Sequence, residues 1–157
     1  MKKVFFTGHR IFKANDETIG NLVAVLIKLI SEGSRDFYAG GALGWDMLCE
    51  KAVLKLRDEF PDIKLHLILP CPPEEQTAFW LILQIEEYHK IIKAADNVEI
   101  VSEHYGKNCM KKRNERLVEL GDVCVCYYNE KKIRSGTGHT VRIAEKQGKE
   151  IINILKL

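Results

Sequence analysis

The chain has 157 residues, of which 46% are hydrophobic and 29% are charged, and its formal net charge is +2. A chain of this length and composition folds around a substantial hydrophobic core, which excludes an intrinsically disordered protein. The small net charge argues against a protein whose main task is to coat nucleic acid, although it leaves room for a local basic cleft.

Strand and helix patterns alternate along the first half of the chain. The apolar segment 2–8 predicts a strand, and after a loop, apolar residues recur at helical spacing over 16–32. A second strand over 36–40 leads through a glycine-rich turn into a helix over 45–60. The third strand, 63–70, is a nearly continuous apolar run, which is typical of a strand covered on both faces.

The alternation continues through the second half of the chain. The expected elements are a long helix over 72–96, a strand over 98–102, a helix over 107–121, a strand over 123–129, a loop and helix over 135–149, and a last strand over 150–155. This order predicts an α/β fold with a mostly parallel sheet and helices on both faces. No internal repeat or linker divides the sequence, so we expect one domain over residues 1–157.

Three features of the sequence favour a cytoplasmic protein. The apolar run in MKKVFFTGHR is too short for a secretory signal, and the most apolar window, 21–30, is too short to span a bilayer and contains Lys28. The five cysteines form no C-x-x-C pair, which argues against a disulfide framework or a zinc site. Cys124 and Cys126 lie two apart in a strand pattern and are expected in the core. We therefore expect no membrane contact, no metal and no cofactor.

The candidate ligand site lies where the predicted strands end. In open parallel sheets, ligands bind at the carboxyl ends of the strands, near the switch in strand order. The candidate residues are Gly8 and Arg10 after the first strand, Gly40, Gly41, Gly44 and Asp46 after the second, Arg113 and Asn114 after the fourth, and Ser135, Gly136, Thr137, Gly138 and Thr140 after the fifth. Small residues and cations gathered at one edge predict an anion site, with phosphate as the best match.

Each group of candidates has a chemical role in this interpretation. Residues 135–138 open a helix whose unpaired N–H groups and partial positive charge can cradle a phosphate, and Thr140 adds a hydroxyl group. Arg10 and Arg113 can each grip an anion in a forked geometry. The glycines allow close approach of the backbone, and Asp46 can accept hydrogen bonds from ribose hydroxyls.

The same residues also have structural interpretations. Glycine-rich turns often serve only as tight turns, and Asp46 can cap its helix instead of binding a sugar. His9 and His139 are single histidines, which are more typical of structural hydrogen bonding than of catalysis. The aromatic residues that can belong either to the core or to a base-stacking surface are Trp45, Trp80 and Tyr105.

Taken together, several segments resemble the SLOG superfamily, the Rossmann-like group that joins the DNA-processing protein DprA (Smf) to the Lonely-guy (LOG) phosphoribohydrolases. The segments are FTGHR (6–10), GGALGWD (40–46), LPCP (69–72), CMKKRN (109–114) and SGTGHTVRIAEKQGK (135–149), with Trp80 and Tyr88 in the long helix. The chain is most similar to the small stand-alone, YpsA-like bacterial branch. The resemblance implies a three-layer Rossmann-like α/β fold with a nucleotide-type ligand over the strand ends.

The LOG relatives imply an enzyme. They cleave the N-glycosidic bond of a nucleoside 5′-monophosphate, with an arginine and with a glutamate in a P-G-G-x-G-T-x-x-E loop. Arg113 matches the arginine, but Thr140 stands where the glutamate belongs. The missing carboxylate argues against hydrolysis, because an oxocarbenium-like transition state is normally helped by an anion and a positioned base.

The DprA relatives imply single-stranded DNA binding in a basic cleft. GGALGWD is similar to their G-x-A-x-G-I-D turn, and RNERLVELGD is similar to their R-N-R-x-I-x-x-L segment. A cleft for single strands combines cations with stacking aromatic rings. Side chains that can supply them are Arg10, Lys111, Lys112, Arg113, Arg142, Trp45 and Tyr105.

The sequence therefore predicts binding of a nucleotide or nucleotide-derived ligand, such as an ADP-ribose-like or nucleoside-monophosphate-like molecule, in a sensor or regulatory role. A LOG-like phosphoribohydrolase and a DprA-like single-stranded DNA-binding module stay open as alternatives. A homodimer is also expected, because LOG relatives are commonly dimers and the helix over 72–96 has apolar residues on more than one face.

Overall fold

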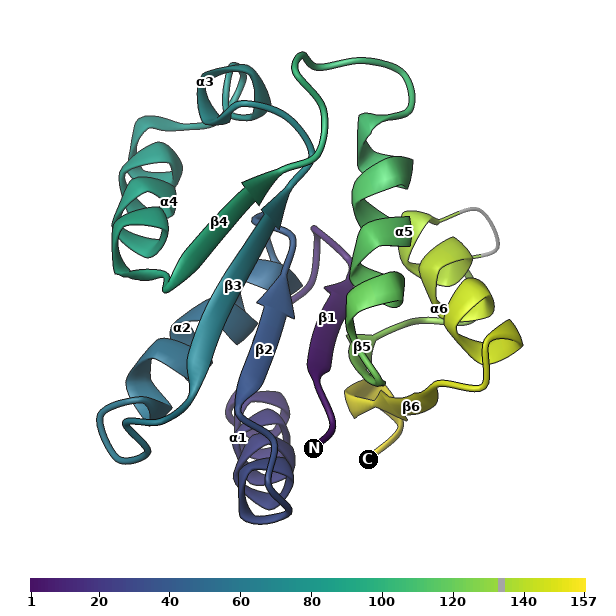
Figure 1. Ribbon diagram of the computed structural model, residues 1–157. Helices are drawn as coiled ribbons and strands as arrows, with labels where there is room; N and C mark the ends of the chain where they lie inside the picture. The colour runs from purple at the N-terminus through teal and green to yellow at the C-terminus, as the bar shows by residue number, and fades with distance from the viewer. Residues whose placement is uncertain (133–134) are drawn as a thin grey trace.

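The computed structural model describes residues 1–132 and 135–157, and in them strands alternate with helices (Figure 1). The strands are β1 (Val4–Gly8), β2 (Asp36–Ala39), β3 (Lys64–Leu69), β4 (Asn97–Ile100), β5 (Val123–Tyr127) and β6 (Glu150–Asn153). The helices are α1 (Asp16–Ser31), α2 (Trp45–Leu56), α3 (Pro73–Gln76), α4 (Ile82–Ala94), α5 (Cys109–Leu120), α6 (Gly136–Lys146) and the 3-10 turn η1 (Ile154–Lys156).

The strands form one sheet in the order β4-β3-β2-β1-β5-β6, and every pairing is parallel. The chain runs outward from β1 to β4 on one side and then adds β5 and β6 on the other side of β1. The register of β1 against β5 runs from Val4 opposite Val123 to Gly8 opposite Tyr127. The switch in strand order therefore lies between β1 and β5, where such sheets leave a crevice at the carboxyl ends.

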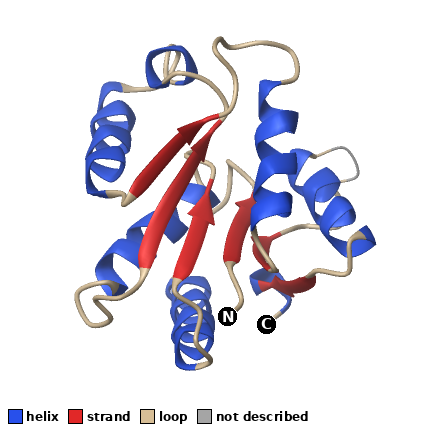
Figure 2. Cartoon of the chain, in the orientation of Figure 1, coloured by secondary structure: helices blue, strands red, loops and turns tan. Residues whose placement is uncertain are grey.

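Helices cover both faces of the sheet, which gives three layers (Figure 2). Val4 and Phe6 point to a core that also takes apolar residues from α1, α2 and α4, whereas Phe5 points to a second core with residues of α5 and α6. This two-sided packing confirms the Rossmann-like α/β fold. Cys124 and Cys126 are fully buried in the core around Phe5, which confirms that they share one face.

The single long helix predicted over 72–96 is wrong. The structure has two helices, α3 and α4, joined by residues 77–81. The backbone N–H and the hydroxyl of Thr77 both donate to the Pro73 carbonyl oxygen, at 3.0 and 2.8 Å, and α3 ends there after one turn. The apolar periodicity continues across this break, so it could not reveal the end of α3.

A buried tertiary network explains why the chain turns after α3. The amide Nε2 of Gln76 donates to the Gly41 carbonyl oxygen at 3.1 Å, and the Tyr88 hydroxyl donates to Gln76 Oε1 at 2.6 Å. These bonds tie α3 to the loop before α2 and to the middle of α4. Buried polar groups need such partners, and here this requirement outweighs helix propensity.

The last strand is shorter than the predicted segment 150–155. β6 ends at Asn153, whose Oδ1 accepts the N–H groups of Tyr128 at 3.1 Å and Leu155 at 3.2 Å. Because the asparagine side chain supplies these bonds, the chain leaves the ladder and turns into η1.

The five cysteines are free and buried. Within residues 1–132 and 135–157, no helix combines the length and apolarity needed to cross a bilayer. The same residues contain no group of three or more His, Cys, Asp or Glu side chains that could hold a metal ion.

Candidate functional site

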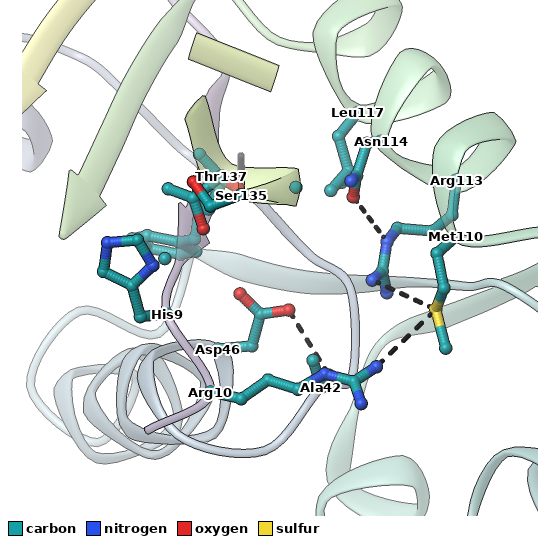
Figure 3. A pocket seen from close by; sticks show the side chains of 14 residues that line it. His9, Arg10, Ala42, Asp46, Met110, Arg113, Asn114, Leu117, Ser135 and Thr137 are labelled. Carbon is teal, nitrogen blue, oxygen red and sulfur yellow. Dashed lines mark hydrogen bonds between the residues drawn. The ribbon is translucent and has the colours of Figure 1, made fainter. Parts of the chain in front are cut away.

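A cavity of about 290 Å³ lies at the carboxyl end of β1, at the switch in strand order. Its walls are the end of β1 with the following loop, the start of α2, one face of α5 and the first turn of α6 (Figure 3). The predicted site residues that line it are Gly8, Arg10, Asp46, Arg113, Asn114, Ser135, Gly136 and Thr137. Segments far apart in the sequence thus meet where the sequence analysis placed the ligand.

The first turn of α6 forms one wall of the cavity. Ser135 is the N-cap, and its hydroxyl oxygen accepts the N–H of Gly138 at 2.9 Å. The remaining N–H groups of a first turn lack partners within the helix, and together with the helix dipole they favour an anion. A Cβ added at Gly136 would have Asn114 Nδ2 as its nearest neighbour, at 3.8 Å. The wall is therefore open at this glycine.

Arg113 lies in the opposite wall, on α5, with only 5% of its surface exposed. Its Nε donates to Asn114 Oδ1 at 2.8 Å, one Nη donates to the Gly40 carbonyl oxygen, and the other approaches Met110 Sδ at 3.7 Å. Burial lowers the pKa of Arg113, and the Asp46 carboxylate opposes that shift. A guanidinium has five N–H donors, so these contacts leave donors for a ligand in the cavity.

Asp46 is buried in the first turn of α2 and lines the cavity. Its Oδ2 accepts the N–H of Ala42 at 3.3 Å, so the carboxylate holds the loop before its own helix. Burial raises the pKa of Asp46, whereas Arg113, the N–H of Ala42 and Arg10 lower it. The structure thus places a buried carboxylate in the cavity wall, within electrostatic reach of two arginines.

Glu50 stands one helical turn behind Asp46 and was missed by the sequence analysis. It is 1% exposed, and its Oε2 accepts the N–H of Gly41 at 3.0 Å. Burial, followed by the neighbouring Asp46 charge, raises the pKa of Glu50 well above its ordinary value. The signal in the sequence was its position four residues after Asp46, which puts both carboxylates on one face of the helix.

Arg10 is exposed and stands at the mouth of the cavity. Its Nη2 lies 3.8 Å from Met110 Sδ, so the thioether contacts both guanidinium groups (Figure 3). Met110 was also missed, although it precedes Arg113 by three residues and so shares its helix face. Arg10 additionally lines two neighbouring hollows.

Three predicted glycines make room for protein atoms. Gly41 and Gly44 have φ values of 70° and 78°, which favour glycine, and a Cβ at Gly44 would overlap the backbone of Arg10. A Cβ at Gly40 would overlap the guanidinium of Arg113. None of the three lines the cavity. Their role in this structure is to shape the loop before α2 and to admit Arg113.

Gly138 and Thr140 also lie outside the cavity lining. Thr140 is fully buried, and its hydroxyl donates to the Gly136 carbonyl oxygen at 2.8 Å. The position that matches the LOG glutamate therefore supplies no carboxylate to the cavity.

Two residues at the end of β1 are structural. His9 Nε2 accepts the N–H of Asn129 at 2.9 Å, which confirms the structural hydrogen bond expected of it, and burial followed by Lys132 lowers its pKa. His9 also lines the cavity. Gly8 packs against Trp45, which is fully buried and belongs to the core.

His139, on α6, is different from His9. Its buried Nε2 has no hydrogen-bond partner among the described residues, so the expected structural bond stays a prediction.

Known proteins are similar to this chain in sequence along most of its length. A UPF0398 protein of Halalkalibacterium halodurans is 28% identical, over 94% of this chain and 82% of its own length. A second, from Staphylococcus haemolyticus, is 29% identical over 84% of this chain and 75% of its own. These relatives match along most of both chains, so the similarity is not confined to one motif.

A solved structure of DNA processing protein A from Helicobacter pylori has the same fold, with a TM-score of 0.65 and 19% identity. It covers 96% of this chain, and this chain spans 63% of the neighbour's length. That neighbour has a described single-stranded DNA binding mode. A family model also matches residues 4–156 from end to end, and the chain therefore belongs to the YspA SLOG family (YpsA).

Proposed function

We propose that the chain binds a nucleotide or nucleotide-derived ligand, such as a nucleoside monophosphate or ADP-ribose, in the cavity at the end of β1. The observation that carries this proposal is the combination of a capped helix N-terminus, two guanidinium groups and a buried carboxylate around one cavity. Helix N-terminus and guanidinium groups attract phosphate, and a carboxylate accepts hydrogen bonds from ribose hydroxyls.

The size of the cavity supports a small ligand. Its volume of about 290 Å³ is at the lower end of the roughly 300–1,000 Å³ usual for small-molecule pockets. In the proposed arrangement the phosphate occupies the α6 end, Arg113 and Arg10 clamp it, and Asp46 binds the sugar.

We assign this binding a sensor or regulatory role. Support comes from Thr140, which replaces the glutamate of LOG enzymes and is bonded within α6. The cytoplasm is the proposed compartment, because five free thiols in one chain suit a reducing environment.

The test is a thermal-unfolding series with AMP, ADP-ribose and NAD. A ligand at a hundred times its Kd should raise Tm by roughly 5–10 °C in a protein of this size. Arg10→Ala should abolish the shift, whereas Lys13→Ala, an exposed cation in the same loop, should keep it. If no nucleotide raises Tm in the wild-type chain, the proposal fails.

Single-stranded DNA binding is the second candidate. It is supported by the neighbour named above and by the exposed Lys111 and Lys112, which follow the cavity-lining Met110 on α5. Affinity for an oligothymidylate should then fall steeply with salt, since each neutralised phosphate adds to the salt dependence. A flat salt dependence would contradict this function.

A homodimer is proposed through the start of α4. Leu81, Ile82 and Leu83 are 70%, 75% and 78% exposed, and such apolar groups often mark interaction surfaces. Light scattering after gel filtration should give twice the 18.0 kDa chain mass, and Leu83→Asp should return the monomer. A monomeric wild-type chain at high concentration would rule this out.

A further inference from the structure

A second hollow of about 320 Å³ adjoins the cavity. Arg10 and Met110 line both, so the two spaces are neighbours with a shared wall. The other side of this hollow is aromatic: it is lined by Phe79, Trp80 and Tyr105. An arginine thus separates an anion-type cavity from an aromatic one.

The aromatic side chains are unusually open to solvent. Phe79 is 100% exposed, Tyr105 is 61% exposed, and Trp80 is half-buried. They come from two different connections, the one between α3 and α4 and the one between β4 and α5. Aromatic rings gain stability when they are covered, and flat rings cover them well by stacking.

Glu75 of α3 holds the connection between β4 and α5. Glu75 Oε1 accepts the N–H of Tyr105 at 3.0 Å, and Glu75 Oε2 lies 3.4 Å from Nδ1 of His104. Glu75 therefore links the end of the β4–α5 connection to α3, and it fixes the backbone that carries Tyr105.

The tryptophan side of the hollow is fixed from behind. Trp80 packs edge-to-face on Tyr88, with ring centroids 5.2 Å apart. The Tyr88 hydroxyl donates a hydrogen bond to Gln76, and the Gln76 amide donates one to the Gly41 carbonyl oxygen. The same loop carries Ala42, whose N–H donates to Asp46. The aromatic wall and the carboxylate of the cavity are thus attached to the same loop.

We infer that the hollow is a subsite for the heterocyclic base of the ligand whose phosphate occupies the cavity. This inference rests on the proposed function and deepens it: the ligand class is a phosphorylated compound that carries a flat base. The base lies against Phe79, Trp80 and Tyr105, and Arg10 lies between base and phosphate. Aromatic rings stack on any base, so the subsite selects for a base more than for its identity.

Binding of AMP and of ribose 5-phosphate, which lacks the base, tests the inference by calorimetry. Wild-type protein should bind AMP about 5- to 150-fold more tightly than ribose 5-phosphate, as stacking of one base on aromatic side chains predicts. Phe79→Ala and Tyr105→Ala should each weaken AMP binding severalfold and leave ribose 5-phosphate unchanged. Ile27→Ala, an exposed apolar residue of α1 outside the hollow, is the control and should change neither.

Tryptophan fluorescence gives an independent readout. The chain has two tryptophans, and Trp45 is fully buried, so quenching by a stacked base must come from Trp80. AMP should quench the wild-type emission, and Trp80→Phe should remove the quenching while AMP still binds.

The outcomes separate the two proposals. Equal affinities for AMP and ribose 5-phosphate, with both aromatic variants unchanged, overturn the base subsite and leave the anion cavity standing. Absence of binding by both compounds, and by the ADP-ribose and NAD of the thermal-unfolding series, overturns the proposed function and the subsite together. Binding of an oligothymidylate without binding of AMP overturns the proposal that the ligand is a mononucleotide. The aromatic side chains of the hollow would then be assigned to stacking on single-stranded DNA.

Discussion

Two walls of the cavity, the loop after β1 and one face of α5, each carry an arginine. The two arginines differ in their burial and in their contacts. Arg113 is buried, bonded to Asn114 and Gly40, and faces the buried carboxylates of α2. Arg10 is exposed, and among the described residues its side chain makes one long contact, with Met110 Sδ. The Arg113 guanidinium is therefore held by the fold and offers a ligand only its remaining N–H donors, whereas the Arg10 guanidinium is free to move toward a ligand.

The largest expected effect comes from Arg113→Ala. It removes the guanidinium that donates to Asn114 Oδ1 and to the Gly40 carbonyl oxygen, and each hydrogen bond of a charged group typically contributes about 1.5–3 kcal/mol. Urea unfolding should show this loss of stability. If Arg113→Ala keeps wild-type stability, Arg113 is no more important to the fold than Arg10.

Gly40→Ala tests the same wall without removing a charge. The added Cβ would overlap the Arg113 guanidinium, and overpacking of this kind costs about 1–3 kcal/mol. Gly136→Ala is the matched control, because its Cβ meets nothing closer than 3.8 Å. The control should keep wild-type stability in urea, and equal losses in both variants would contradict the packing argument.

The pH dependence of stability tests the carboxylates behind Arg113. The pKa of Glu50 is raised in the folded chain, so between its ordinary value of about 4.3 and the raised one, the native state holds a proton that the unfolded state has lost. Wild-type stability therefore falls there as pH rises, by at most about 1.4 kcal/mol per pH unit for one proton. Glu50→Gln should lack this fall, so its stability relative to wild type should increase with pH.

The control for this experiment is Glu59→Gln, which changes an exposed carboxylate in the turn after α2. Its stability relative to wild type should not vary in the same way. A constant difference between Glu50→Gln and wild type from pH 4 to pH 7, roughly the window set by the ordinary carboxyl pKa, would show that Glu50 ionises normally.

Arg10→Ala should have the smallest effect on stability, within about 0.5 kcal/mol, as is usual for exposed positions. Its effect should instead be on nucleotide affinity, measured by calorimetry. A loss of stability as large as that of Arg113→Ala would show that the two arginines are equivalent after all.

The sequence predicted the sheet well, and it predicted that several candidate residues meet at one edge of it, for physical reasons. Apolar runs such as the one in β3 mark strands covered on both faces, and alternation with helices forces parallel pairing. Parallel strands end at one edge, so residues after different strands, such as Arg10 and Ser135, were correctly brought together.

What the sequence did not show depends on tertiary contacts. The break after α3 follows from Gln76 bonding to distant residues, which no local pattern encodes. The glycines before α2 were interpreted as space for a ligand, but the space at Gly40 is taken by Arg113 from another helix. Met110 carries no charge, so its chemistry did not predict a position between two guanidinium groups.

The position of the cavity between β1 and β5 has a mechanical consequence. The cavity joins residues from the first third of the chain to residues of α5 and α6, across the line where the two halves of the sheet meet. A bound ligand would act as a staple across that line. Amide hydrogen exchange at β1 and β5 should slow more on ligand binding than exchange at the outer strands β4 and β6. Ligand binding would thus make the centre of the sheet more rigid.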